Sequence, residues 1–168
     1  MRVTTRTRYA IRALYDLAFH RRGQSALAKE IAARQQIPLR FLEQILQDLR
    51  RAGLIEARRG PHGGYALARP PAEITLAAVL RAVRGPLEDL LGVDVRPRAP
   101  RRNAAALRAQ GAGAVATDPA DDVPARVWAE VGGRLIDVLE QTTLADFVAR
   151  AEATGVRRAA LPATMYFI

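Results

Sequence analysis

The sequence predicts a mainly α-helical fold with a small β wing: a winged helix-turn-helix domain followed by a long C-terminal dimerisation helix. Residues 25–68, SALAKEIAARQQIPLRFLEQILQDLRRAGLIEARRGPHGGYALA, have the pattern of a helix, a tight turn, a second helix and a glycine-tipped two-stranded ribbon. That order is typical of a winged helix-turn-helix, whose second helix fits the major groove of DNA. Apolar residues at spacings of three and four in residues 124–141 indicate a helix that pairs with another helix.

The positive charge of the chain is confined to its first 69 residues. The formal net charge is +9 at pH 7. Residues 1–69 contain fourteen basic and five acidic side chains, whereas residues 70–168 contain twelve of each. DNA phosphates attract a segment with such an excess. Because the excess coincides with the segment that has a DNA-reading shape, it is stronger evidence than basic composition alone.

The composition excludes several other classes of protein. The 168 residues contain no cysteine, which excludes disulfides, thiolate zinc sites, cysteine nucleophiles and thiolate-bound iron–sulfur clusters. The sequence has no nucleotide-type glycine loop, and its two histidines have no evident carboxylate partner, so we expect no enzyme and no cofactor. No segment approaches the roughly 20 apolar residues of a membrane helix, and none at the N-terminus resembles a signal peptide. We therefore expect a cytoplasmic protein without a membrane partner.

Local signals predict where the helices begin and end. Thr4 or Thr5 can cap the first helix, and Ser25 is the expected cap of the second. Pro38 suits the first turn of the third helix, and Gly53 is expected to end it. The expected buried stripe of the third helix is Phe41, Leu42, Ile45, Leu46 and Leu49.

The ribbon and the later helices follow from similar signals. Two short strands are expected at residues 54–58 and 65–68, joined by the sequence GPHGG. Thr75 and Thr143 are expected to cap two further helices, at residues 76–83 and 144–153.

Three parts of the chain differ in character. Residues 1–90 are expected to form the DNA-binding domain, residues 91–123 a variable loop, and residues 124–168 the dimerisation helix and a tail. The loop is rich in proline, glycine and isolated charges, with a brief helix possible at residues 104–109. The seam of the dimerisation helix is expected to consist of Trp128, Val131, Leu135 and Val138. The pair Gly132-Gly133 lowers the stability of this helix by roughly 1 kcal/mol per glycine. Either a close helix crossing offsets this cost, or the helix is less rigid at the pair.

Three segments resemble the Rrf-two family of bacterial transcription regulators, which includes iron–sulfur sensors. They are MRVTTRTRYAIRALYDLAF, IPLRFLEQILQDLRRAGLI and ARRGPHGGYALA, and the RGP-x-GGY loop after an LEQ-containing helix is quite specific. The resemblance covers about residues 1–90 in sequence and the rest in arrangement. It implies a homodimer that binds an inverted-repeat operator in double-stranded DNA.

The resemblance also implies which residues contact DNA. Phosphate contacts fall at the start of the first helix, major-groove contacts on the outer face of the third helix, and a minor-groove contact on the wing arginine, Arg59. The predicted DNA-binding set is Thr5, Arg6, Tyr9, Ser25, Arg40, Phe41, Glu43, Gln44, Arg58, Arg59, Gly60, Pro61, His62 and Gly63.

The residue types in two of these regions suit base reading independently of the resemblance. Arg40 and Gln44 lie one turn apart, and arginine can read guanine and glutamine adenine, each for about 1–3 kcal/mol. Glu43 would accept a hydrogen bond from cytosine. An arginine beside a glycine-rich tip suits a narrow, electronegative minor groove. The alternative is that both regions are merely solvated.

One departure from the family is large. The iron–sulfur sensors carry three cysteines in the loop that corresponds to about residues 92–110, and this chain has none. The remaining donors for a hard metal ion lack the spacing of a site, so we expect no metal. These donors are His20, His62, Asp94, Asp118, Asp121 and Asp122.

The sequence therefore predicts a homodimeric, sequence-specific DNA-binding transcriptional regulator. We expect a repressor without a cysteine-ligated cluster, and whether a small-molecule or protein effector exists is left open. The alternative is an adaptor that regulates a metabolic enzyme through protein contacts, with DNA binding secondary. The confinement of charge to residues 1–69 argues against it.

Overall fold

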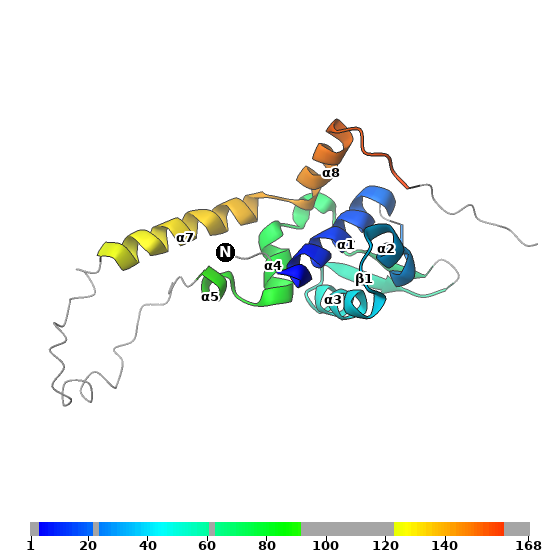
Figure 1. The fold of residues 1–168 in the computed structure, drawn as a ribbon, viewed down its shortest axis with the longest axis horizontal. Coiled ribbons are helices and arrows are strands. Elements are labelled where there is room, and N and C mark those ends of the chain that lie inside the picture. The colour runs from blue at the N-terminus through cyan, green and yellow to red at the C-terminus, as the bar shows by residue number, and fades with distance from the viewer. Residues whose placement is uncertain (1–3, 22–23, 61–62, 92–122, 160–168) are drawn as a thin grey trace, which may run out of the picture.

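The computed structural model describes residues 4–21, 24–60, 63–91 and 123–159. It is mainly helical with one two-stranded antiparallel sheet, which confirms the predicted fold class (Figure 1). The first helix, α1, lies at the centre and packs against four other helices. These elements are α1 (Thr5–Arg21), α2 (Ala28–Gln35), α3 (Leu39–Arg51), α4 (Leu76–Arg84) and α8 (Leu144–Ala153).

Helix α1 begins at a threonine cap and supplies much of the core. The side-chain oxygen of Thr4 accepts a hydrogen bond from the Thr7 N–H at 3.3 Å, so Thr4 is the cap of the two candidates. Leu14 and Leu17 are buried in the main hydrophobic core. Each such leucine contributes roughly 1.5–3 kcal/mol through burial.

Helix α2 begins later than predicted, and the assignment of Ser25 as its cap is wrong. The residue before the helix is Leu27, whose N–H donates to the Glu30 carboxylate at 3.1 Å. Ala26 forms an antiparallel bridge with Tyr65, with N–H···O distances of 2.9 and 2.8 Å. The chain is therefore held extended at Ala26, and the helix can begin only after it.

The turn between α2 and α3 is short and strained. Gln36 adopts the left-handed conformation, with φ at 51°. The Ile37 N–H donates to the Ala32 carbonyl at 3.0 Å, and the Ile37 side chain is buried. Pro38 is the residue that precedes α3, one position earlier than predicted. Leu42, Ile45, Leu46 and Leu49 are buried as expected, whereas Phe41 is half-buried.

The wing consists of β1 (Ile55–Arg58) and β2 (Gly64–Leu67), paired so that Ile55 faces Leu67. Gly64 has a φ of 138°, and a Cβ there would lie 2.4 Å from the Ala26 carbonyl oxygen. Only glycine therefore allows the ribbon to approach the helix-turn-helix closely enough for the bridge at Ala26.

The remaining helices follow the predicted caps, with two additions. The Thr75 side chain accepts from the Ala78 N–H at 3.1 Å, and the Thr143 side chain accepts from the Asp146 N–H at 3.4 Å. Both threonines are therefore the helix caps that the sequence predicts. The sequence analysis did not predict the short helices η1 (Pro71–Glu73) and α5 (Leu87–Leu91).

Helix α7 (Val123–Gln141) extends away from the winged-helix body (Figure 1). It runs unbroken through Gly132-Gly133, so the glycine pair does not interrupt it. Its C-terminal half is attached to the body, because Leu139 is buried with Leu80 and Leu87 of α4 and α5. The expected loop at residues 92–122, with its possible helix at 104–109, lies outside the described residues.

Backbone and side-chain contacts join α7 to the winged-helix body. The Leu76 N–H donates to the Thr142 carbonyl at 2.8 Å. The Glu140 carboxylate pairs with Arg81 and accepts a hydrogen bond from the Thr75 hydroxyl at 3.0 Å. The hydrogen bond from Arg81 lowers the pKa of Glu140 below its ordinary value. The base of α7 is therefore held against the start of α4.

The segment after α8 returns to the end of α1. Arg158 lies 4.5 Å over the Phe19 ring and donates a hydrogen bond to the Phe19 carbonyl. The Ala159 N–H donates to Nδ1 of His20 at 2.8 Å, so this nitrogen must be unprotonated. Burial lowers the pKa of His20, although the nearby Asp16 carboxylate opposes that effect. The guanidinium groups of three arginines lower it further: Arg34, Arg158 and Arg21.

We expect this contact to make folding stability depend on pH. The pKa of His20 is lower in the folded state than in the unfolded state. The contribution of His20 to the free energy of unfolding is therefore complete above the unfolded-state pKa of about 6.5 and falls as the pH drops below that value. Urea unfolding at pH 7.5 and 5.0 should show a greater loss for the wild type than for His20→Asn. Asparagine keeps an acceptor oxygen but does not titrate, so equal losses would contradict the expectation.

Candidate DNA-binding surface

The outer face of α3 carries exposed polar side chains opposite its buried stripe. Arg40, Glu43 and Gln44 are exposed, whereas Leu42 and Ile45 between them are fully buried. The predicted major-groove residues are therefore on the accessible side of the helix, apart from the half-buried Phe41. A helix with free hydrogen-bonding side chains in its first two turns has what base-edge reading requires.

The start of α1 lies beside α3. The Tyr9 and Phe41 rings are in edge contact, with centroids 5.8 Å apart. Arg6 forms an ion pair with Asp48 of α3, so this arginine has a protein partner that competes with its predicted phosphate contact. Thr5 is exposed and lies 3.5 Å from an Arg8 nitrogen. The structure thus brings the first two predicted contact regions together.

The wing presents two arginines before its glycine turn. Arg58 forms an ion pair with Glu56 at 2.8 Å, and Arg59 is exposed. Gly60 has a φ of 102°, and its carbonyl accepts from the Gly63 N–H at 2.8 Å. A Cβ at Gly63 would lie 2.7 Å from the Arg58 carbonyl oxygen, so glycine is required there. The predicted contacts Pro61 and His62 lie outside the described residues.

A buried polar network, which was not predicted from the sequence, underlies this surface. Asp16 of α1 is 0% exposed. Its carboxylate accepts from Arg34 at 2.7 and 3.0 Å and from the Gln35 amide at 3.0 Å. Gln35 is the last residue of α2, directly before the left-handed Gln36. The network therefore holds the end of α2 against α1 at the point where the chain turns toward α3.

A sequence signal for this network was present. Asp16 lies between Leu14 and Leu17 on the face that the helical periodicity assigns to the core. A carboxylate in such a position needs a partner, because burying an unpaired charge is costly. What the sequence alone does not show is that the partner comes from the end of α2.

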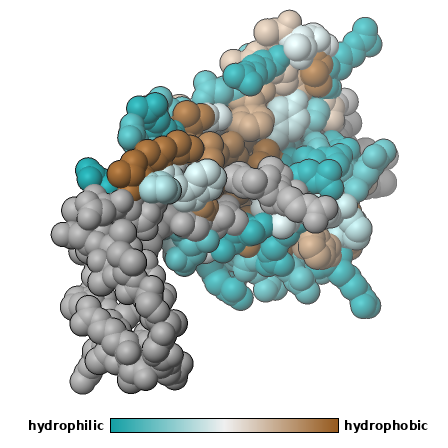
Figure 2. Space-filling model, turned by 60° about the vertical axis from the view of Figure 1, so that its left-hand side comes forward, coloured by the Kyte–Doolittle hydropathy of each residue, from teal (hydrophilic) through white to brown (hydrophobic). Residues whose placement is uncertain are grey.

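The exposed half of α7 carries a continuous apolar face (Figure 2). Trp128 is 59% exposed and Val138 is 57% exposed, and Val131 and Leu135 between them are exposed as well. These are the four residues predicted for the dimer seam. An apolar face of this kind on a helix is typical of a protein–protein contact.

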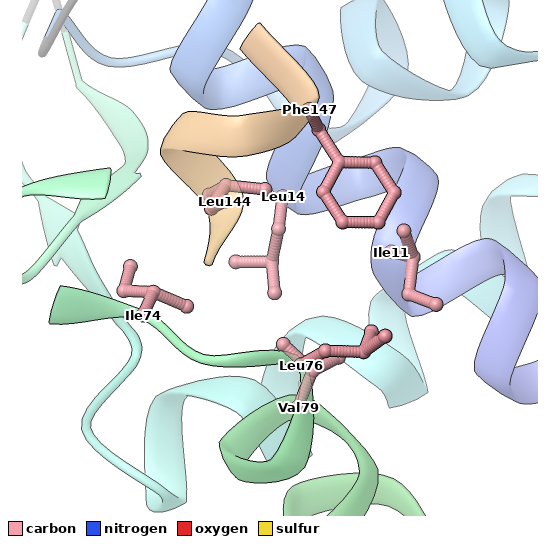
Figure 3. Close-up of a pocket in the computed structure, with 7 residues that line it drawn as sticks. All are labelled: Ile11, Leu14, Ile74, Leu76, Val79, Leu144 and Phe147. Carbon is pink, nitrogen blue, oxygen red and sulfur yellow. The ribbon is translucent and has the colours of Figure 1, made fainter. Parts of the chain in front are cut away.

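A small apolar pocket lies between α1, α4 and α8 (Figure 3). Its space is about 10 Å³, room for roughly one water molecule. With no polar group in its lining, it is a packing gap and not a site for an effector. The residues that line it are Ile11, Leu14, Ile74, Leu76, Val79, Leu144 and Phe147.

The fold and the exposed helix define a winged-helix DNA-binding regulator, and comparison with known proteins gives its family. The Rrf2 family profile, described as iron-dependent transcriptional regulators, matches residues 3–150. The chain is 35% identical over 150 residues to the HTH-type transcriptional regulator IscR of Cereibacter sphaeroides, covering 88% of this chain and 87% of the relative. The chain belongs to the Rrf2 family of transcriptional regulators.

Solved structures share the fold, among them IscR and CymR. IscR of T. potens superposes with a TM-score of 0.67 at 29% identity, covering 95% of this chain and 94% of that one. CymR, the global cysteine regulator of B. subtilis, superposes with a TM-score of 0.66 at 26% identity, covering 89% and 98%. Among the described residues, no helix has the length and hydropathy needed to cross a membrane.

The side chains of this protein do not fit a thiolate-held iron–sulfur cluster. The full sequence has no cysteine. In the part of the chain that the structure describes, no three His, Asp or Glu side chains come together as metal ligands. Nδ1 of His20 is already engaged as the acceptor for Ala159. We therefore assign no role to such a cluster in this chain.

The buried network gives a stability prediction. Asp16→Asn should lower the free energy of unfolding by about 1.5–3 kcal/mol, because the buried site loses the charge-assisted hydrogen bonds from Arg34 and Gln35. Glu56→Gln, which removes the exposed partner of Arg58, should cost less than about 1 kcal/mol. Urea unfolding of both variants measures the difference, and a cost at Asp16 as small as that at Glu56 would show the network to be dispensable.

Proposed function

We propose that the protein is a homodimeric repressor that binds an inverted-repeat operator in double-stranded DNA. The observation that carries the proposal is the exposed face of α3, with Arg40, Glu43 and Gln44 free to meet bases. The net charge of +9 on residues 1–69 supports it, because phosphate attraction acts on the same segment. A dimer seated on a promoter would exclude the polymerase, which is the physical basis of repression.

The apolar face of α7 supports the homodimer. A second copy of the same helix would cover Trp128, Val131, Leu135 and Val138 through a two-fold axis, as symmetric dimers do. That axis would place the two α3 helices about 34–36 Å apart, or at a multiple of that spacing. The operator would then be a palindrome. We further propose that a signal, if one exists, acts through the segment at residues 91–123.

Binding of the purified protein to genomic DNA fragments across a salt series tests the function. The proposal expects one palindromic fragment to be selected, with affinity falling steeply as salt rises, because each neutralised phosphate adds to the slope. The absorbance spectrum of the same sample shows whether a coloured cofactor is present. Colourless protein that selects no fragment would instead favour an adaptor that acts through protein contacts.

The wing arginine gives a second test. Arg59→Ala should weaken operator binding by about 1–3 kcal/mol with the fold intact, because a minor-groove contact is lost. Arg58→Ala is the matched control, and we expect a smaller effect because Arg58 pairs with Glu56. Fluorescence anisotropy with labelled operator measures both, and circular dichroism checks the fold. Unchanged affinity for Arg59→Ala would rule out the minor-groove role.

The dimer seam gives a third test. Leu135→Glu should release monomers at about 1–10 μM, because an unpaired carboxylate in an apolar interface is costly. Asp137→Lys is the control, since Asp137 is exposed and lies on the polar side of the same helix. Sedimentation velocity distinguishes monomer from dimer. A Leu135→Glu protein that stays dimeric would place the interface elsewhere.

A further inference from the structure

Nine large apolar side chains are exposed among the described residues. Six of the nine lie on α7, where the proposed dimer would cover them. The other three are Leu27, Leu39 and Val156. Leu27 and Leu39 stand at the N-terminal ends of α2 and α3, and each is 42% exposed. The ends of the two helix-turn-helix helices thus present apolar side chains among polar neighbours.

Leu39 lies at the border between the buried stripe of α3 and the exposed face that carries the residues proposed to read bases, on the side of Glu43. It is the first residue of the helix, and Glu43 lies one turn further on, on the same side. Arg40 and Gln44 form the adjacent exposed row. N-terminal residues of a recognition helix are the ones that contact base edges, and Leu39 is 42% exposed at that end, so its side chain can reach a base edge beside Glu43.

We propose that Leu39 contacts the C5-methyl group of a thymine in each half-site, which adds a specificity contact to the proposed DNA-binding function on which this inference rests. A leucine side chain neither donates nor accepts a hydrogen bond. The one base-edge feature in the major groove that it can recognise is therefore the thymine methyl. That thymine lies beside the base pair that Glu43 contacts, because the two side chains are one helical turn apart.

Replacing thymine by uracil tests the contact without changing any hydrogen-bonding group of the base. The probe is the duplex that full-length protein selects from random-sequence DNA, with each thymine of one half-site replaced in turn by deoxyuridine. For wild-type protein, one replacement should weaken binding about four-fold, the factor that burying a group the size of one methyl supplies. For Leu39→Ala, the same replacement should have no effect.

Leu27→Ala is the matched control, because Leu27 has the same exposure but precedes the helix that crosses the DNA backbone. It should keep the wild-type sensitivity to deoxyuridine. The inference fails if no thymine is sensitive in the wild type, or if the same thymine remains sensitive in Leu39→Ala. The deoxyuridine series measured on wild-type protein tests the inference even if a variant fails to fold. Failure to select any sequence would overturn the proposed function itself.

Discussion

A carboxylate buried in the middle of α1 places the strictest condition on this fold. Removing Asp16 from water is costly unless its oxygens are bonded, and Arg34 and Gln35 of α2 provide those bonds. The two helices must therefore meet in one relative position. Since the tight turn at Gln36 follows at once, the direction in which α3 leaves the body depends on the same contact. The orientation of the candidate DNA-reading face of α3 thus depends on the buried charge of Asp16.

Two backbone contacts fix the positions of the wing and of α7 relative to these helices. The bridge between Ala26 and Tyr65 ties the wing to the residues just before α2. A second bridge, between Thr75 and Thr143, ties the base of α7 to the start of α4. Backbone hydrogen bonds of this kind are short and directional, so they fix the position of one segment against the other. The wing, α3 and α7 are consequently parts of one connected frame.

Most of the fold could be predicted from local patterns, because caps, glycines and apolar periodicity act over a few residues. The accessible face of α3 followed from the same periodicity. Contacts between distant residues could not be predicted in this way. Ser25 was misassigned because the bridge that delays α2 comes from Tyr65, and the Asp48 partner of Arg6 lies 42 residues away. Ala159, the hydrogen-bond partner of His20, lies 139 residues away, and no local sequence pattern predicts this contact.

Among the described residues, α7 contacts the winged-helix body only through its C-terminal half, so the helix can act as a lever. Its C-terminal half is held by Leu139 and Glu140, while its N-terminal half stands clear of the body. A helix of 19 residues is about 28 Å long, so a tilt of about 10° at the base moves the far end by about 5 Å. By the same geometry, a displacement of a few ångströms at Val123 corresponds to only a small rotation at the contact with α4.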